Sequence, residues 1–183
     1  MARNTNKMRL VLVSCCAPCS SGAIQQLVDG QIPDVDDFVV LFFNPNLFPE
    51  SEYQKRMVEQ IRYCDLLGVR HVELEYDHDA WRDAVRGLES EPERGARCGV
   101  CFEYRFRRAA DWARANGYDA VASVLGVSRH KDQAQVDRAG ESVASDVKYI
   151  PIKWDESLRI QIGRASDFYR QNYCGCEFSI RKV

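Results

Sequence analysis

The 183-residue chain lacks several features that would assign it to a class of protein. It has no apolar run long enough to span a bilayer, and no internal repeat or low-complexity tract. Its first eight residues form a short polar segment without the apolar stretch of a secretory signal. We therefore expect no membrane partner and a cytoplasmic location, where thiols stay reduced.

The chain also has little net charge, −2 at pH 7, which argues against binding of polyanions through bulk charge alone. A local basic face stays open, because arginine greatly outnumbers lysine, and Arg105, Arg107 and Arg108 follow a cysteine pair. Arginine suits bidentate contact with phosphate. The alternative is a general bias toward arginine on solvated helix faces.

Cysteine, by contrast, is plentiful. Seven of the eight cysteines fall into three short groups: Cys15, Cys16 and Cys19; Cys98 and Cys101; Cys174 and Cys176. The eighth, Cys64, lies among apolar residues of a helical pattern and is predicted to be a core residue. In a reducing compartment, grouped cysteines indicate metal ligands or redox-active thiols rather than structural disulfides.

Strand-like and helix-like patterns alternate along the chain. Continuous apolar runs at 8–14 and 38–43 are typical of strands buried on both faces of a parallel sheet. Further strands are expected at 71–76, 120–125 and 149–152, and helices at 22–28, 52–67, 78–88, 98–116, 131–139 and 156–170. This order predicts an α/β fold, a three-layer sandwich with a mostly parallel sheet, formed by a single domain over 1–183.

The double cysteine follows the first strand and precedes a helix, at the sheet edge where such folds bind ligands. Backbone amides and the positive helix end favour the thiolate there. Adjacent cysteines seldom serve one tetrahedral ion, but each can bind a different iron of a cluster. Cys98 and Cys101, one turn apart on a helix face, have a spacing found in zinc and iron–sulfur sites. Together the four thiolates are enough for a four-iron cluster.

Three other interpretations of these cysteines are open. The same four residues could bind one structural zinc ion. A thiol–disulfide oxidoreductase would use Cys98 and Cys101, but it leaves Cys15 and Cys16 without a purpose. An ATP-using tRNA thiolation enzyme would need a glycine-rich phosphate loop after the first strand, whereas this chain has no glycine there before Gly22 and no lysine.

The late pair, Cys174-Gly175-Cys176, suits a catalytic dithiol. Gly175 gives the backbone freedom for the two thiols to meet, and a disulfide across one residue is strained and easily reduced. The alternatives are two free thiols or two more metal ligands. Cys19 is either an accessory metal ligand or a buried thiol.

Five segments carry a resemblance to a known family, and they occur in this order: Val11–Ser21 (VLVSCCAPCSS), Phe43–Pro49 (FNPNLFP), Glu91–Cys101 (EPERGARCGVC), Ser128–Asp132 (SRHKD) and Tyr169–Cys176 (YRQNYCGC). Across nearly its whole length the chain resembles the QueH type of epoxyqueuosine reductase. The resemblance implies a fold similar to the nucleotide α-hydrolase-like (HUP) sandwiches. It also implies reduction of epoxyqueuosine to queuosine at the wobble position of tRNA, the last step of queuosine biosynthesis.

The resemblance assigns roles to the cysteines. It implies a [4Fe-4S] cluster on Cys15, Cys16, Cys98 and Cys101, and a redox-active disulfide between Cys174 and Cys176. The chain departs from the family at two positions: Val13 where many members have histidine, and Cys19 where many have aspartate. If that aspartate binds a second metal, an additional mononuclear iron, Cys19 must take its place or the role moves elsewhere.

The reaction also needs protons, electrons and an RNA site. His130 is the predicted proton donor because its reference pKa is near neutral, with Tyr173 as a further candidate. An external electron donor of unknown identity is expected. Residues expected to hold the splayed anticodon of the tRNA are Asn44, Asn46, Tyr53, Arg97, Arg105, Arg129 and Lys131. The alternatives are that Asn44 and Asn46 only cap a turn and that His130 contacts phosphate.

Overall fold

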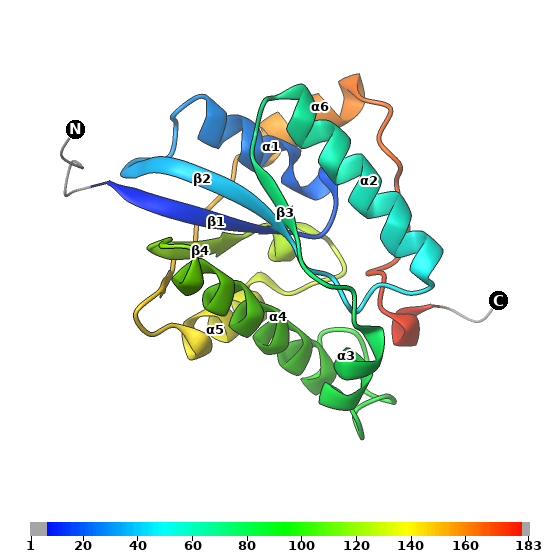
Figure 1. Cartoon of the computed structure of the whole chain (residues 1–183). Coiled ribbons are helices and arrows are strands. Elements are labelled where there is room, and N and C mark those ends of the chain that lie inside the picture. The colour runs from blue at the N-terminus through cyan, green and yellow to red at the C-terminus, as the bar shows by residue number, and fades with distance from the viewer. Residues whose placement is uncertain (1–6, 181–183) are drawn as a thin grey trace.

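A five-stranded parallel sheet forms the centre of the molecule, as the computed structural model shows for residues 7–180 (Figure 1). Most of the polar N-terminal segment considered above lies outside the described residues. The sheet order is β3-β2-β1-β4-β5, and every neighbouring pair is parallel. The strands are β1 Met8–Ser14, β2 Val35–Phe42, β3 His71–Glu73, β4 Ala120–Ser123 and β5 Lys148–Tyr149.

Helices cover both faces of this sheet (Figure 1). On one face lie α1 Ala17–Val28, α2 Glu50–Leu66 and α6 Glu156–Ala165. On the other lie α4 Ala96–Ala115 and α5 Gln133–Val143, with α3 His78–Ala84 against α4. Two short 3-10 helices complete the chain, η1 Leu125–Val127 and η2 Glu177–Ser179. The predicted α/β class and three-layer sandwich are confirmed.

Two apolar cores explain the continuous apolar runs of the sequence. Val11 and Val13 of β1 pack with Phe106 of α4 in one core, while Leu10 and Leu12 pack with Ile24 of α1 in the other. Because β1 is covered on both faces, alternate residues cannot be polar. Cys64 of α2 has no exposed surface and belongs to the second core, as its apolar surroundings in the sequence predicted.

The first or last residues of several helices and strands differ from the predicted ones. Helix α1 begins at Ala17 rather than Gly22, because Pro18 needs no backbone hydrogen-bond donor in a first turn. Strand β5 ends at Tyr149, so the predicted strand at 149–152 was wrong beyond its first residue. Pro151 has no N–H to continue the ladder. Helix α6 ends at Ala165, five residues before the predicted end.

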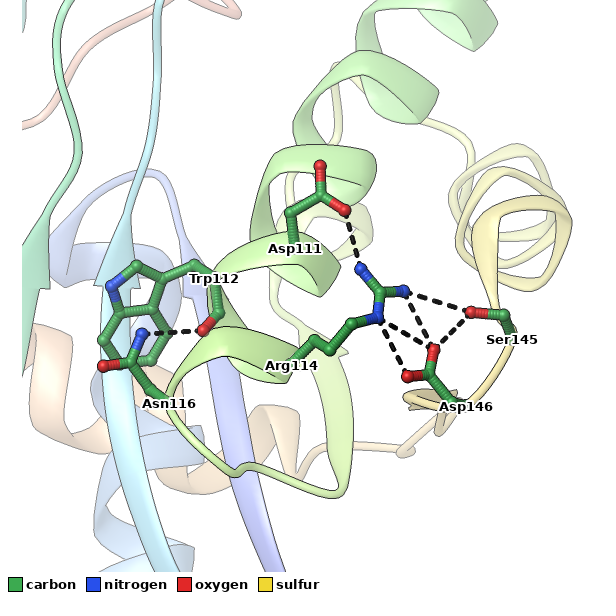
Figure 2. A network of polar contacts seen from close by, with 6 residues as sticks. All are labelled: Asp111, Trp112, Arg114, Asn116, Ser145 and Asp146. Carbon is green, nitrogen blue, oxygen red and sulfur yellow. Dashed lines mark hydrogen bonds and ion pairs between the residues drawn. The ribbon is translucent and has the colours of Figure 1, made fainter.

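Charged side chains gather at the amino edge of the sheet and hold the loops there. Arg114, near the end of α4, pairs with Asp146 at 2.9 Å and with Asp111 at 2.8 Å (Figure 2). The same guanidinium donates to Ser145 Oγ, so it ties α4 to the loop before β5 (Figure 2). Within residues 7–180, no helix combines the length and the apolar character needed to cross a membrane.

Candidate metal centre and substrate pocket

The double cysteine lies in the tight connection between β1 and α1. Cys16 is the extended N-cap residue of α1, and the first helical turn brings Cys19 back beneath it, with the Cys19 N–H donating to the Cys16 carbonyl at 3.2 Å. As a result the sulfurs of Cys15, Cys16 and Cys19 all lie within 4.8 Å of one another. Cys15 and Cys16 are 3% and 1% exposed. A buried group of three sulfurs at this spacing is able to hold a metal ion.

Electrostatics single out Cys15 as the thiolate of this group. Hydrogen bonds from the thiols of Cys16 and Cys19 lower the pKa of Cys15 well below its usual value, and the charges of Lys131 and Arg105 add to the effect, against the opposing effect of burial. The same contact with Cys15 raises the pKa of Cys16 to about 12. A thiolate is the form that binds metal.

Lys131 supplies a buried cation beside that thiolate. Its Nζ lies 3.5 Å from the sulfur of Cys15. Burial disfavours the ammonium form, but the thiolates of Cys15 and Cys174 outweigh it and raise the pKa of Lys131 to about 12. The charge of Lys131 also acts on Cys101 at the start of α4. The end of β1 and the start of α4 therefore meet at this lysine.

Helix α4 brings the second cysteine pair to the same place. Cys98 packs against the apolar cluster that contains Cys15 and Cys16, and the backbone N–H of Arg94 donates to its sulfur at 3.3 Å. Cys101 is buried beside Trp81 and Cys176. The pKa of both thiols is raised, and the largest cause is burial, which removes them from water. The structure thus packs Cys98 against the core that contains Cys15 and Cys16, and the cluster shared by the four cysteines stays a prediction.

The Cys174-Gly175-Cys176 segment docks onto the same edge. The Phe48 N–H donates to the Gly175 carbonyl at 2.9 Å, and Leu47 and Cys176 form an isolated β-bridge. The charge of Cys174 acts on both Cys98 and Cys101. Both thiols of the segment are free in this structure. The redox-active role of the pair stays a prediction.

A pocket of about 870 Å³ opens above these thiols, with Cys15, Cys19 and Cys174 in its wall. His130 and Tyr173, the two predicted proton donors, also line it. Among the residues that line the pocket, Glu156 is the one acid, whereas six are cationic: Arg56, Arg129, Lys131, Arg159, Arg164 and Arg170. An electropositive cleft with thiols in its wall suits a polyanionic substrate that undergoes redox chemistry.

Most of the residues expected to hold RNA lie inside the protein instead. Asn44 donates to the Ser14 carbonyl at 2.9 Å and accepts from Arg105, whose guanidinium also donates to the Phe43 carbonyl. These bonds favour the alternative that Asn44 fixes a turn. Their effect is to hold the loop after β2 against α4.

Three more of these residues are equally enclosed. Tyr53 donates to Glu73, and Arg97 donates to the carbonyls of the loop before α4. Asn46 is 2% exposed. Of the seven predicted RNA contacts, only Arg129 and Lys131 line the pocket.

Several other residues that line the pocket were not predicted from the sequence. Arg159 and Arg164 come from α6, and Arg170 and Gln171 from the segment after it. The Gln171 amide donates to the sulfur of Cys16 at 3.4 Å. Arginines on a polar helix resemble any solvated helix face, so no local signal identified them. Their role depends on where α6 packs, which Gly22 permits: a Cβ there would lie 2.9 Å from the Arg159 backbone.

Known proteins resemble this chain over nearly its whole length. The family model described as "Epoxyqueuosine reductase QueH" matches residues 10–182. The chain belongs to the QueH family. A relative of that name from Histophilus somni is 39% identical over 180 residues, covering 94% of this chain and 72% of its own length. Another from Acinetobacter baylyi is 38% identical over 183 residues, covering 96% and 82%.

Two solved structures share the fold of this QueH family member. The U34-tRNA thiolase NcsA from Methanococcus maripaludis, a structure determined with its [4Fe-4S] cluster, aligns with a TM-score of 0.61 at 14% identity. The alignment covers 96% of this chain and 62% of the thiolase. A predicted tRNA methyltransferase subunit from Methanocaldococcus jannaschii gives 0.53 at 12% identity, covering 86% and 74%. At these identities the likeness shows the fold alone, and it agrees with the predicted three-layer α/β sandwich.

Proposed function

We propose that this chain reduces epoxyqueuosine to queuosine at the wobble position of tRNA. The observation that carries the proposal is a group of three cysteine sulfurs within 4.8 Å of one another, two of which, those of Cys15 and Cys19, belong to residues that line one cationic pocket. Membership of the QueH family and the name shared by its relatives support the same reaction. We also propose that the chain forms a single domain over 1–183 and acts in the cytoplasm.

The residues at the site fit an iron–sulfur cluster. Its ligands would be Cys15, Cys16, Cys98 and Cys101, which supply the four thiolates that such a cluster needs. Two buried N–H groups nearby, Arg56 Nη2 and Trp81 Nε1, have no hydrogen-bond partner among the described residues. Donors of this kind can bond to the sulfur atoms of a cluster, which would account for their burial. When bound, the cluster would supply electron transfer.

The remaining chemistry falls to the chain's own residues. Removing the epoxide oxygen consumes two electrons and two protons and releases an alkene and water. Oxidation of Cys174 and Cys176 to a disulfide yields two electrons, and the external donor then restores the dithiol. We assign the proton donor to His130, which lines the pocket with its Nδ1 3.7 Å from Glu93, and keep Tyr173 as the alternative.

The RNA contacts follow from the pocket wall. Arg129, Arg159, Arg164 and Arg170 surround the opening and would bind phosphates next to the splayed base. Lys131 would act on Cys15 rather than on phosphate, because its Nζ is buried against that sulfur. An accessory mononuclear iron at Cys19 is also proposed, since its sulfur completes the group with Cys15 and Cys16.

The direct test is purification without oxygen, followed by iron and sulfide counting and an assay on epoxyqueuosine-containing tRNA. We expect iron and sulfide in a cluster on each chain and conversion of the tRNA to the queuosine form. Zinc without iron or sulfide would instead favour the structural zinc site. A protein that holds the cluster and leaves the modified tRNA unchanged would contradict the assigned reaction.

A further inference from the structure

Arg56 of α2 is a buried cation to which the sequence gave no role. Only 1% of it is exposed, although it lines the wall of the pocket. Its Nε donates to Glu52 Oε1 at 2.7 Å within the same helix. The other carboxylate oxygen of Glu52 accepts from the Tyr169 hydroxyl at 2.7 Å. Glu52 holds the guanidinium in one orientation, and Tyr169 holds Glu52, so the charge of Arg56 has a fixed position.

The guanidinium also contacts the Cys174–Cys176 segment. Arg56 Nη1 donates to the Cys174 carbonyl at 3.2 Å. Gly175 adopts a φ of +103° against this group, and a Cβ there would lie 2.9 Å from Nη1 and 2.2 Å from Leu47 Cδ2. A glycine is therefore needed for the segment to approach so closely. Arg56 forms part of the surface against which the backbone of Cys174 and Gly175 packs.

The third nitrogen of Arg56 is left unpaired in a pocket wall that also contains Cys15. Nη2 is buried and has no hydrogen-bond partner among the described residues. Arg56 shares the wall of the pocket with Cys15. Burial alone would lower the pKa of Arg56, but Cys16, Cys15 and Glu52 outweigh it and raise that pKa. A guanidinium stays protonated at every relevant pH, so this site always carries one positive charge. One cation thus lies in the same pocket wall as Cys15 and in contact with the backbone of the Cys174–Cys176 segment.

We propose that Arg56 is a positioning residue that holds the Cys174–Cys176 segment in place and raises the reduction potential of the cluster bound by the four cysteines. The proposal rests on the function proposed above. Reduction adds one negative charge to a cluster, and a fixed cation nearby stabilises that charge. Glu52 offsets part of the effect, because its carboxylate is the counter-charge of Arg56.

Charge substitutions test the proposal through the sign of the potential shift. The midpoint potential is measured by spectroelectrochemical titration of the holoprotein. Arg56→Gln should move the potential to a more negative value, Glu52→Gln to a more positive value, and Arg56→Lys should leave it near the wild-type value. The matched control is Arg62→Gln, which changes an arginine of the same helix whose side chain is 56% exposed. It should have no effect.

The pattern separates an electrostatic role from a merely structural one. Loosening of the site would shift the midpoint potentials of Arg56→Gln and Glu52→Gln in the same direction, and that result would overturn the proposal. A wild-type potential for Arg56→Gln would also overturn it. If Arg56→Gln does not retain a cluster, the other two variants decide: an unchanged or more negative potential for Glu52→Gln contradicts the proposal.

Alkylation of Cys174 measures the contact with the late thiols. Both Arg56 variants should react faster with iodoacetamide than Arg62→Gln, because the bond to the Cys174 carbonyl is lost or weakened. Equal rates would remove the positioning role. A wild-type protein that binds no iron and sulfide would instead refute the proposed function itself.

Discussion

At the amino edge of the sheet, charged side chains pair with one another within reach of water, whereas at the carboxyl edge several cations are buried. Arg9 and Arg70 both bind Asp37, and Arg114 binds Asp146 in the network of Figure 2. At the opposite edge, Arg105 has only carbonyl and amide oxygens as hydrogen-bond partners, and Lys131 lies against a sulfur.

This difference identifies the edge that carries the chemistry. Exposed ion pairs contribute about 0–1 kcal/mol each, so they can be gained or lost with little effect. Removing a charge from water costs roughly several kcal/mol unless the surroundings compensate the charge. Buried cations beside thiols are therefore retained for a purpose, and the purpose indicated here is to stabilise negative sulfur.

The largest expected effect is on the cysteines of the carboxyl edge. Cys98→Ala should abolish the brown cluster absorbance and turnover together, because one of four ligands is lost. The matched control is Cys64→Ala in the second core, which should keep cluster and turnover and lose about 1 kcal/mol of stability. Absorbance, iron content and the tRNA assay on both variants check this. Survival of turnover in Cys98→Ala would refute the ligand role.

The next effect compares one arginine from each edge. Arg105→Gln should lower the free energy of unfolding by about 3 kcal/mol, because it leaves buried oxygen atoms of Phe43 and Asn44 with poorer partners. Arg70→Gln at the amino edge should cost less than about 1 kcal/mol. Urea unfolding of both variants measures the difference. Similar losses would mean that the two edges do not differ in the way described.

A smaller effect is expected in RNA binding. Arg164→Gln removes one cation of the pocket wall and should reduce the slope of log affinity against log salt by about 0.7–0.9. Arg114→Gln removes an arginine from the amino edge and should leave that slope unchanged. Anisotropy titrations with tRNA at several salt concentrations report both slopes. Equal changes in the two variants would argue against a defined RNA face.

The smallest effect concerns acid stability at the amino edge. Burial alone would raise the pKa of Asp37, but Arg70 and Arg9 outweigh it and hold the pKa below its usual range. The carboxylate therefore contributes stability above the unfolded pKa of about 3.9, and this contribution is lost as pH falls through the lower folded pKa. Wild type and Asp37→Asn should differ by a few tenths of a kcal/mol near pH 6 and converge in acid, in unfolding experiments across pH. A difference that grows in acid would reverse the sign of this argument.

Much of the fold was accessible from local patterns. The run Met8–Ser14 predicted β1 with both ends correct, because the buried middle of a strand that is covered on both faces must be apolar. The same alternation of elements predicted the sheet edge at which Cys15 and Cys16 lie. Residue order also determined that Cys98 and Cys101 share the start of a helix. These features depend on near neighbours in the chain.

Which charged side chains are buried was decided by tertiary structure. Lys131 meets Cys15 across 116 positions of the chain, and Arg56 meets the Cys174 carbonyl across 118. Within their own helices or loops, such residues look like any solvated cation. Their roles arise only when distant segments exclude water from them, because the strength of a charge–sulfur interaction depends on the local dielectric rather than on sequence neighbours.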